Sequence, residues 1–302
     1  MTNRDIAVVV VAAGRGERLG AGKPKAFVDL VGKPLLSHAI ESISALPDLA
    51  QLIIAVPESH QIEATEAAHE LLTDADVQLD IVVGGETRQG SIANALAVLS
   101  SHANVVLVHD AARAMTPTSV FSRVADSVRK TGLSTVPVMK IADTIKRIEG
   151  EVVRETIDRN VLRAAQTPQG FVAGDLVAAY GEASQEFTDD AALMQAAGHE
   201  VLAVEGHDQA FKVTTPEDLA AAEMRFGGHY RSGIGTDVHR FTDDSSKPLY
   251  RRLGQAALPR NRGLAWRARA RWPQRWRRRQ PRNRGCNVVC SRPRRHWLKL
   301  WR

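Results

Sequence analysis

The first 250 residues of this 302-residue chain contain no cysteine and no tryptophan. The two cysteines, Cys286 and Cys290, lie near the C-terminus, and two thiols there do not make a disulfide framework. The chain begins MTNRDIAVVVVAAG, whose apolar run is too short for a transmembrane span and lacks a small-residue cleavage pattern. We therefore expect a cytoplasmic protein that has no membrane partner.

Acidic side chains are absent from the last 52 residues. Residues 251–302 hold eighteen Lys or Arg and all five Trp, but no Asp or Glu. The formal charge of +6 thus conceals an acidic main part, because residues 1–250 carry 34 acidic and 22 basic side chains, a net charge of −12. That part is long enough to bury a sizeable core as one α/β domain. The tail shows little apolar periodicity, and we expect it to be disordered.

Short apolar strands alternate with amphipathic helices through the main part. The strand patterns fall at Ile6–Ala12, Leu52–Val56, Leu79–Val83 and Val105–Val108. The helical patterns fall at about 34–46, 59–72, 88–101 and 117–131. This alternation predicts βαβ units in a Rossmann-like, mostly parallel sheet that is flanked by helices.

The alternation changes after the strand pattern at Val136–Val138. Residues 140–160, KIADTIKRIEGEVVRETIDRN, turn at Glu149-Gly150 and predict a β-hairpin arm that projects from the sheet. The patterns that follow predict a helix over Thr188–Ala197, a strand over Val201–Val204 and a helix over Pro216–Arg225, started by a Thr-Pro pair.

The first loop, AAGRGERLGAGKPKAF (12–27), has the composition of a phosphate-binding loop. It follows the first strand, where a doubly wound sheet binds its ligand. Gly14 and Gly16 allow backbone N–H groups to approach a phosphate, and Arg18, Lys23 and Lys25 supply positive charge. The loop matches neither a Walker A motif nor a dinucleotide fingerprint. Taken alone, it could equally be a solvated basic loop.

Further segments narrow this interpretation. The loop resembles the signature of nucleotidyltransferases that activate sugars and alcohols. Four further parts of the signature follow the loop in order: VVGGETRQGSI (82–92), LVHDAARAM (107–115), ADTIKR (142–147) with TIDRNVLRAAQTPQGF (156–171), and FKVTTPEDLAAAE (211–223). Over about residues 4–228 the chain resembles the 2-C-methyl-D-erythritol 4-phosphate cytidylyltransferases of the non-mevalonate isoprenoid pathway.

The resemblance implies a reaction and an assembly. CMP would pass from CTP to methylerythritol phosphate with release of pyrophosphate, and Mg²⁺ would accompany CTP. The chain would form a homodimer in which each arm crosses to the other subunit. The alternative is another sugar- or alcohol-phosphate nucleotidyltransferase, against which the TIDRN–TPQGF and FKVTTPEDL segments argue.

The resemblance also implies roles for individual residues. Arg18 and Lys25 would stabilise the α-phosphate as it becomes five-coordinate. The implied nucleotide-binding residues are Ala12, Ala13, Gly14, Gly16, Gly85, Glu86, Arg88, Ser91, Asp110, Ala111 and Arg113. The implied binding residues for methylerythritol phosphate are Thr144, Arg159, Thr167 and Lys212. From the residues alone, Ser91 could instead cap a helix, Asp110 could cap the next segment or help hold Mg²⁺, and the arm could pack on its own domain.

A second resemblance begins at residue 231. The stretch SGIGTDVHRF (232–241) puts Asp237 and His239 on one face of a strand, as a metal site would. RSGIGTDVHRF resembles the opening of the 2-C-methyl-D-erythritol 2,4-cyclodiphosphate synthases, which are fused to the cytidylyltransferase in some bacteria. There these two side chains bind a metal such as Zn²⁺ with a third ligand in a GHSDGD motif. The chain has no such motif, so we expect no cyclase activity.

A shifted reading frame is our hypothesis for the origin of the tail. Permissible codons for WPQRWRRRQPR (272–282), read one base downstream, encode GHSDGDVASHA, and the same shift in residues 289–301 allows SAAGLGDIGSNFG. We therefore interpret 1–230 as a cytidylyltransferase domain, 231–250 as the remnant of a cyclase domain and 251–302 as out-of-frame sequence. The alternative is that the Arg and Trp side chains of the tail bind nucleic acid.

Overall fold

The chain divides into two compact units, residues 1–228 and 229–302. The structure, a computed structural model, describes residues 4–14, 16, 19–20, 22–72, 74 and 76–227, together with two short strands of the second unit. These are β13 (Ile234–Thr236) and β14 (Val288–Val289), which pair antiparallel. The predicted metal ligands Asp237 and His239, and the rest of the basic tail, lie outside the described residues.

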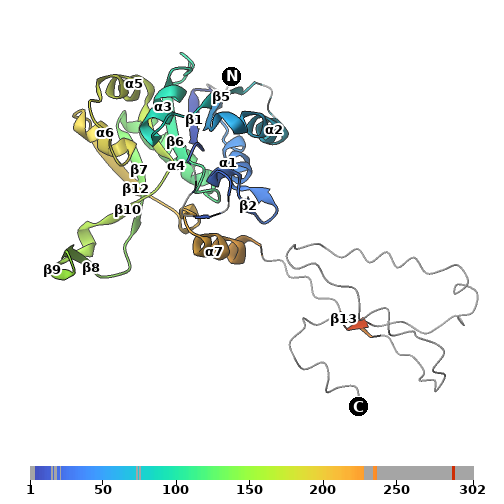
Figure 1. The fold of residues 1–302 in the computed structure, drawn as a ribbon. Helices are drawn as coiled ribbons and strands as arrows, with labels where there is room; N and C mark the ends of the chain where they lie inside the picture. Colours follow the sequence, from blue (N-terminus) through green and yellow to red (C-terminus); the bar gives the residue numbers. More distant parts are fainter. Residues whose placement is uncertain are drawn as a thin grey trace, which may run out of the picture. The chain divides into compact units, whose positions relative to one another are not determined.

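An eight-stranded sheet forms the centre of the first unit (Figure 1). Its parallel part runs in the order β6 (Val105–Asp110), β1 (Ile6–Val11), β4 (Leu49–Val56) and β5 (Gln78–Val83). Beyond β6 lie the antiparallel β11 (Gln169–Val172) and then β7 (Ser134–Lys140), which also pairs with β10 (Arg163–Ala165) and β12 (Val201–Glu205). The predicted mostly parallel sheet is confirmed.

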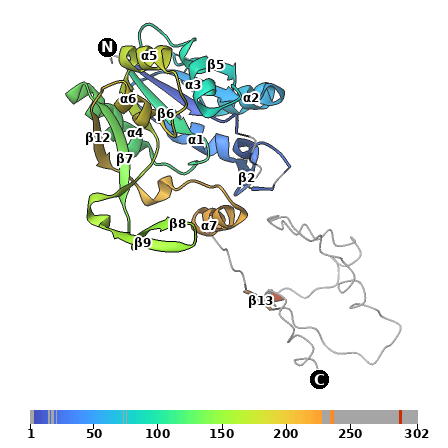
Figure 2. The same ribbon diagram turned by 60° about the vertical axis from the view of Figure 1, so that its left-hand side comes forward.

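Helices cover both faces of this sheet (Figure 2). One layer consists of α1 (Leu35–Ser44), α2 (Gln61–Leu71) and α4 (Thr118–Thr131). The other consists of α3 (Arg88–Leu96), α5 (Ala173–Glu182) and α6 (Asp190–Ala196). Val8 and Val10 of β1 face the first layer, whereas Ala7 and Val9 face the second. Burial on both faces explains why this strand reads as a continuous apolar run.

Two elements next to β6 were not predicted. Strand β11 carries Gly170, where an added Cβ would lie 2.5 Å from the Val124 side chain. Its neighbour Phe171 is fully buried against the second helix layer. Helix α5 follows directly, and α3 ends at Leu96 rather than at the predicted residue 101. The sequence pattern missed β11 because a four-residue strand with Gly at its second position has little apolar periodicity.

The predicted hairpin arm is present. Strands β8 (Ile145–Glu149) and β9 (Val152–Ile157) pair only with each other and project away from the sheet (Figure 1). At the other end of the chain's first unit, helix α7 (Pro216–Phe226) begins at a capping box formed by Thr215 and Asp218, as the Thr-Pro pair predicted. Among the helices that the structure describes, none is long and apolar enough to cross a membrane.

The last helix of the first unit packs beside the phosphate-loop region. Helix α7 lies against the short hairpin formed by β2 (Asp29–Leu30) and β3 (Lys33–Pro34). A third apolar cluster fills this contact and includes Leu19, Leu30 and Ala222. The end of the first loop and the segment before α7 are thereby held near each other.

Candidate active site

A cleft of about 610 Å³ opens at the carboxyl ends of β1 and β6. Ligands of open α/β sheets bind at this edge of the sheet. The cleft gathers ten of the eleven predicted nucleotide-binding residues: Ala12, Ala13, Gly14, Gly16, Gly85, Glu86, Arg88, Ser91, Asp110 and Ala111. Lys25 and Lys212, predicted from the same resemblance, also line it. Four separate segments of the sequence therefore meet here.

Two glycines allow the walls of the cleft to approach closely. Gly16 has φ +72°, and an added Cβ would lie 2.9 Å from the backbone nitrogen of Lys25. Gly84 has no room for a side chain either, because an added Cβ would lie 2.2 Å from the Cβ of Ala13. A larger residue at Gly84 would push apart the first loop and the 84–91 segment, whereas one at Gly16 would push Lys25 away within the first loop.

The loop before α3 is held by hydroxyl groups. Thr87 is the N-cap of α3, and its side chain accepts a hydrogen bond from the amide of Gly90. Ser91 Oγ donates to the carbonyl of Thr87 at 2.9 Å and accepts from the amide of Gly85 at 3.1 Å. The alternative of Ser91 as a helix cap is therefore wrong, since Thr87 has that role. Ser91 instead fixes the backbone of Gly85 beside the cleft.

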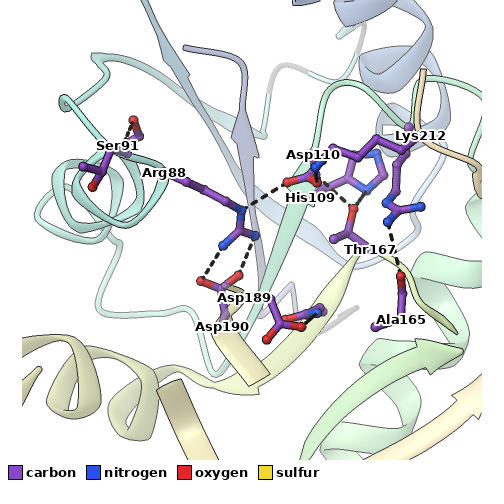
Figure 3. A network of polar contacts seen from close by, with 12 residues as sticks. Arg88, Ser91, His109, Asp110, Ala165, Thr167, Asp189, Asp190 and Lys212 are labelled. Atoms are coloured by element: carbon purple, nitrogen blue, oxygen red, sulfur yellow. Dashed lines mark hydrogen bonds and ion pairs between the residues drawn. The ribbon is translucent and has the colours of Figure 1, made fainter. Parts of the chain in front are cut away.

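Asp110 stands between two cations at the end of β6 (Figure 3). Lys212 Nζ lies 2.7 Å from Oδ2 of Asp110, and Arg88 Nε donates to Oδ1 at 3.3 Å. Burial alone would raise the pKa of the Asp110 carboxyl, but the charges of Arg88 and Lys212 outweigh burial and hold this pKa well below its usual range. The carboxylate is thus charged and oriented at neutral pH. No helix begins at Asp110, so the alternative of an N-cap does not hold.

Arg88 is also bound from its other side. Its two terminal nitrogens donate to the two carboxylate oxygens of Asp190, at 3.1 and 2.7 Å. Asp190 accepts a further hydrogen bond from the Tyr180 hydroxyl at 2.5 Å. Burial would lower the pKa of Arg88, but Asp190 and Asp110 overcome this effect and raise it. Asp190 and Tyr180 were not predicted from the sequence, in which Asp189-Asp190 is only an acidic pair at the start of the predicted helix Thr188–Ala197.

A neutral histidine lies beneath Asp110. His109 is fully buried, and its Nδ1 lies 3.2 Å from Thr167 Oγ1, which also accepts a hydrogen bond from the Asp110 amide at 3.0 Å. Burial lowers the pKa of His109 from 6.5 to about 3. The imidazole therefore stays uncharged near neutral pH and packs on Phe121, with ring centroids 4.8 Å apart.

The low pKa of His109 predicts that the folded protein loses stability in acid. The folded state binds its proton near pH 3, whereas the unfolded state binds it near pH 6.5, so lowering the pH favours unfolding within that window. Between pH 7.5 and pH 5, His109 should contribute a loss of about 2 kcal/mol in the free energy of unfolding. Urea unfolding of the nucleotide-free protein at both pH values measures this loss.

His109→Asn should make the loss about 2 kcal/mol smaller, although the variant starts from a lower stability. The matched control is His102→Asn, because His102 is exposed and its removal should leave the pH dependence unchanged. An unchanged pH dependence in His109→Asn would contradict the assignment.

Arg113 does not line the cleft. Its terminal nitrogens donate to the carbonyls of Ala210, at 2.7 Å, and Ala165, at 3.2 Å. Its Nε is buried without a hydrogen-bond partner within the described part of the chain. The guanidinium therefore ties the turn after β6 to the segment that carries Lys212. Its predicted nucleotide contact stays a prediction.

Three of the four predicted substrate-binding residues lie away from the cleft lining. Thr144 is exposed on the arm, and Arg159 is exposed beside it, where it donates to the carbonyl of Ala142. Thr167 is only 4% exposed and lies behind Asp110. Lys212 is the one that reaches the cleft within this chain.

Of the two predicted catalytic cations, Arg18 and Lys25, only Lys25 belongs to the described residues. Arg18 lies outside the described residues. Lys25 begins a short 3₁₀ helix (Lys25–Phe27), and its amide donates to the carbonyl of Gly14 at 3.4 Å. The charge of Lys25 also contributes to the lowered pKa of Asp218 in α7, after the larger effect of the hydrogen bonds from the Thr215 and Thr214 amides. Lys23 lies 3.8 Å from Asp29 on the surface, as expected of a solvated charge.

The chain is similar to known proteins in both its sequence and its fold. The sequence profile of the family described as IspD, 2-C-methyl-D-erythritol 4-phosphate cytidylyltransferase, matches residues 6–227. The crystal structure of 2-C-methyl-D-erythritol 4-phosphate cytidylyltransferase from Thermus thermophilus has a TM-score of 0.60 at 33% identity and covers 73% of this chain and 98% of that one.

Curated relatives agree with these matches. A 2-C-methyl-D-erythritol 4-phosphate cytidylyltransferase of Streptomyces coelicolor is 41% identical over 226 residues, 72% of this chain and 83% of that protein. A bifunctional enzyme IspD/IspF of Clavibacter michiganensis is 45% identical over 271 residues, 86% of this chain, so this likeness extends beyond residue 227. The chain spans 65% of that bifunctional protein. The chain belongs to the family of 2-C-methyl-D-erythritol 4-phosphate cytidylyltransferases, which are nucleotidyltransferases.

Proposed function

We propose that this chain transfers the cytidylyl group of CTP to 2-C-methyl-D-erythritol 4-phosphate, giving 4-diphosphocytidyl-2-C-methyl-D-erythritol and pyrophosphate. The observation that carries this proposal is the convergence of four family segments on one cleft at the carboxyl ends of β1 and β6. CTP is a nucleotide of the cytoplasm, and we place the reaction in that compartment.

The reaction is a displacement at phosphorus. An oxygen of the substrate's phosphate attacks the α-phosphorus of CTP in line with the departing oxygen. The bond from the α-phosphorus to the oxygen that bridges to the β-phosphorus breaks, and pyrophosphate carries away the electron pair. Two anions must meet in this step, so the protein acts mainly by positioning them and by stabilising negative charge.

The residues of the cleft fit these tasks. The backbone around Ala13, Gly14 and Gly16 can accept the triphosphate, because two of these three residues carry no side chain. Lys25 supplies positive charge at the same loop, and Arg18 is the second cation that we assign there. Lys212, held by Asp110, offers its ammonium group to the substrate's phosphate from the opposite wall.

A magnesium ion would enter with CTP. In the described part of the chain, no three His, Cys, Asp or Glu side chains cluster to hold a metal ion. The cleft lining contains two carboxylates, Glu86 and Asp110, and Asp110 at the end of β6 fits an ion that takes most of its ligands from phosphate oxygens and water. When bound, Mg²⁺ would neutralise charge on the phosphates. We assign Asp110 as the side chain that would hold it.

The arm supports a homodimer. Ile148 and Val153 are cross-strand partners on the arm, and they are 59% and 56% exposed. Val152 beside them is also 51% exposed, and apolar side chains gathered on a projecting arm favour contact with another protein. A second copy of this chain would bury this pair, and it would also receive Thr144 and Arg159, which do not reach the cleft of their own chain. We therefore propose that these two residues complete the cleft of the partner subunit.

Introducing charged residues at the apolar surface of the arm should separate the two subunits of the proposed dimer. The double variant Ile148→Asp/Val153→Asp should elute as a monomer by light scattering at concentrations where the parent chain is a dimer, because four carboxylates would face each other across the contact. Its kcat/KM for methylerythritol phosphate should fall at least tenfold. The matched control is Ile62→Asp, since Ile62 is 77% exposed on α2, away from the arm. A monomeric parent chain, or a dimeric double variant, would contradict the proposed interface.

Acceptor selectivity tests the proposed reaction. Pyrophosphate release from CTP should require methylerythritol phosphate, and it should be at least 100-fold slower with glucose 1-phosphate or ribitol 5-phosphate. Equal release with these acceptors would show another nucleotidyltransferase specificity.

No cyclase activity is proposed, because the sequence lacks the GHSDGD ligand motif. Resequencing the gene tests the frame shift, which requires the shifted GHSDGD codons in the DNA.

A further inference from the structure

A buried ionic network extends from Arg88 and Asp110 in the cleft lining to Asp190, which does not line the cleft. Asp190 is 1% exposed, yet it holds the guanidinium of Arg88 through two hydrogen bonds (Figure 3). It also accepts a hydrogen bond from the Tyr180 hydroxyl. Burying a carboxylate is costly unless it is paired and hydrogen-bonded. Four elements contribute to the network, since Tyr180 lies on α5, Asp190 on α6, Arg88 on α3 and Asp110 on β6.

The geometry of Arg88 limits what it can do. Each terminal nitrogen donates to one oxygen of Asp190, which occupies the end-on edge of the guanidinium, and Nε donates to Asp110. A guanidinium binds a phosphate best through two parallel hydrogen bonds, and here that edge is occupied. Arg88 is thus arranged to orient Asp110 rather than to grip the triphosphate.

Residues 185–190, the segment that ends at Asp190, also bind the first turn of α3 through Gln89. Gln89 donates to the carbonyl of Gln185 at 3.2 Å and accepts from the amide of Phe187 at 3.1 Å. This turn also carries Thr87 and Ser91, which fix the Gly85 backbone at the cleft. The 185–190 segment therefore sets the position of both Arg88 and the loop before α3.

We propose that Asp190, with the Tyr180 hydroxyl, is a positioning residue for cytidylyl transfer: it holds Arg88 so that Arg88 orients the Asp110 carboxylate, which in turn holds Lys212 in the cleft. This inference rests on the proposed function. Asp190 does not touch the reacting atoms, and its effect on the reaction passes through Arg88. Removing its charge frees the two terminal nitrogens of Arg88 to turn toward Asp110 and the triphosphate.

The test compares Asp190→Asn with the parent chain. Its kcat should be at least 20-fold lower, while its KM for CTP should be no higher than that of the parent, because the freed guanidinium adds positive charge near the phosphates. A merely structural lesion would instead loosen the cleft and raise this KM. Tyr180→Phe, which removes only one hydrogen bond to Asp190, should lower kcat about threefold.

A double-mutant cycle separates an effect through Arg88 from a general loss of structure. Asp190→Asn should add less than a twofold loss of kcat in an Arg88→Gln background, and the melting temperatures of the variants should show the same coupling. The control is Asp5→Asn, because Asp5 is a buried carboxylate that pairs with Arg129 before the amino end of β1, away from the cleft. It should lower the melting temperature but leave kcat and KM unchanged.

Two results would overturn the inference. One is a folded Asp190→Asn protein whose kcat is within threefold of that of the parent chain. The other is an Arg88→Gln/Asp190→Asn protein whose loss equals the product of the two single losses. Failure of the parent chain itself to transfer the cytidylyl group would instead count against the proposed function.

Discussion

Replacing Lys25 with alanine should lower kcat about 10³-fold and leave the melting temperature within a few degrees of that of the parent chain. Lys25 follows the glycine loop and lines the cleft in which we propose that the α-phosphate binds. Negative charge grows on that phosphate as it becomes five-coordinate, and removing one preorganised donor to such a charge typically costs about 10²–10³ in turnover. Steady-state pyrophosphate release at saturating CTP measures the loss.

Lys23→Ala is the matched control for this prediction. Lys23 belongs to the same loop but lies 3.8 Å from Asp29, and its side chain is 42% exposed. Its removal should change kcat by less than threefold. If Lys25→Ala retained near-normal turnover, or if Lys23→Ala lost as much, the assignment of the loop's catalytic cation would be wrong. Arg18→Ala should lose turnover on a similar scale.

Asp110→Asn should lower kcat/KM at least 100-fold. The substitution keeps the shape of the side chain but removes the charge that separates Arg88 from Lys212. Lys212 would then lose its ionic partner and turn toward a phosphate in an unproductive orientation, while Arg88 would stay paired with Asp190. Loss of a preorganised charged contact in a closed site has effects of about this size.

A second acidic residue of the sheet provides the comparison. Asp80 on β5 is half-buried and accepts hydrogen bonds from Gln51 and Gln78, but it does not line the cleft. Asp80→Asn should leave kcat/KM within threefold of the parent value. Asp110→Asn with nearly full activity would show that the carboxylate has no role in transfer.

Much of this fold could be predicted because its signals are local. The buried strand β1 reads as a continuous apolar run, and α7 begins at a Thr-Pro pair that forms a capping box. Strand β11 gave no such signal, since its place between β6 and β7 depends on the tight contact of Gly170 with α4 and β6. That contact joins residues far apart in the sequence, which periodicity does not record.

The same distinction holds for the site. The first loop has a glycine-rich, basic composition that is compatible with phosphate binding, and the family resemblance, not composition, predicted the residues of the Gly85–Ser91 segment. Asp190 could not be found in this way, because its partner Arg88 is 102 positions away and its own neighbourhood looks like an ordinary helix start. Thr167 likewise reads as a substrate residue by resemblance, whereas the structure buries it between His109 and the Asp110 amide.

The most direct measurement is the identity of the product. The purified full-length chain, incubated with CTP, methylerythritol phosphate and Mg²⁺, should form 4-diphosphocytidyl-2-C-methyl-D-erythritol and pyrophosphate in equal amounts, as resolved by ³¹P NMR and mass spectrometry. Omitting either substrate should abolish both signals. A folded protein that forms neither compound, or that transfers CMP equally well to unrelated sugar phosphates, would contradict the account.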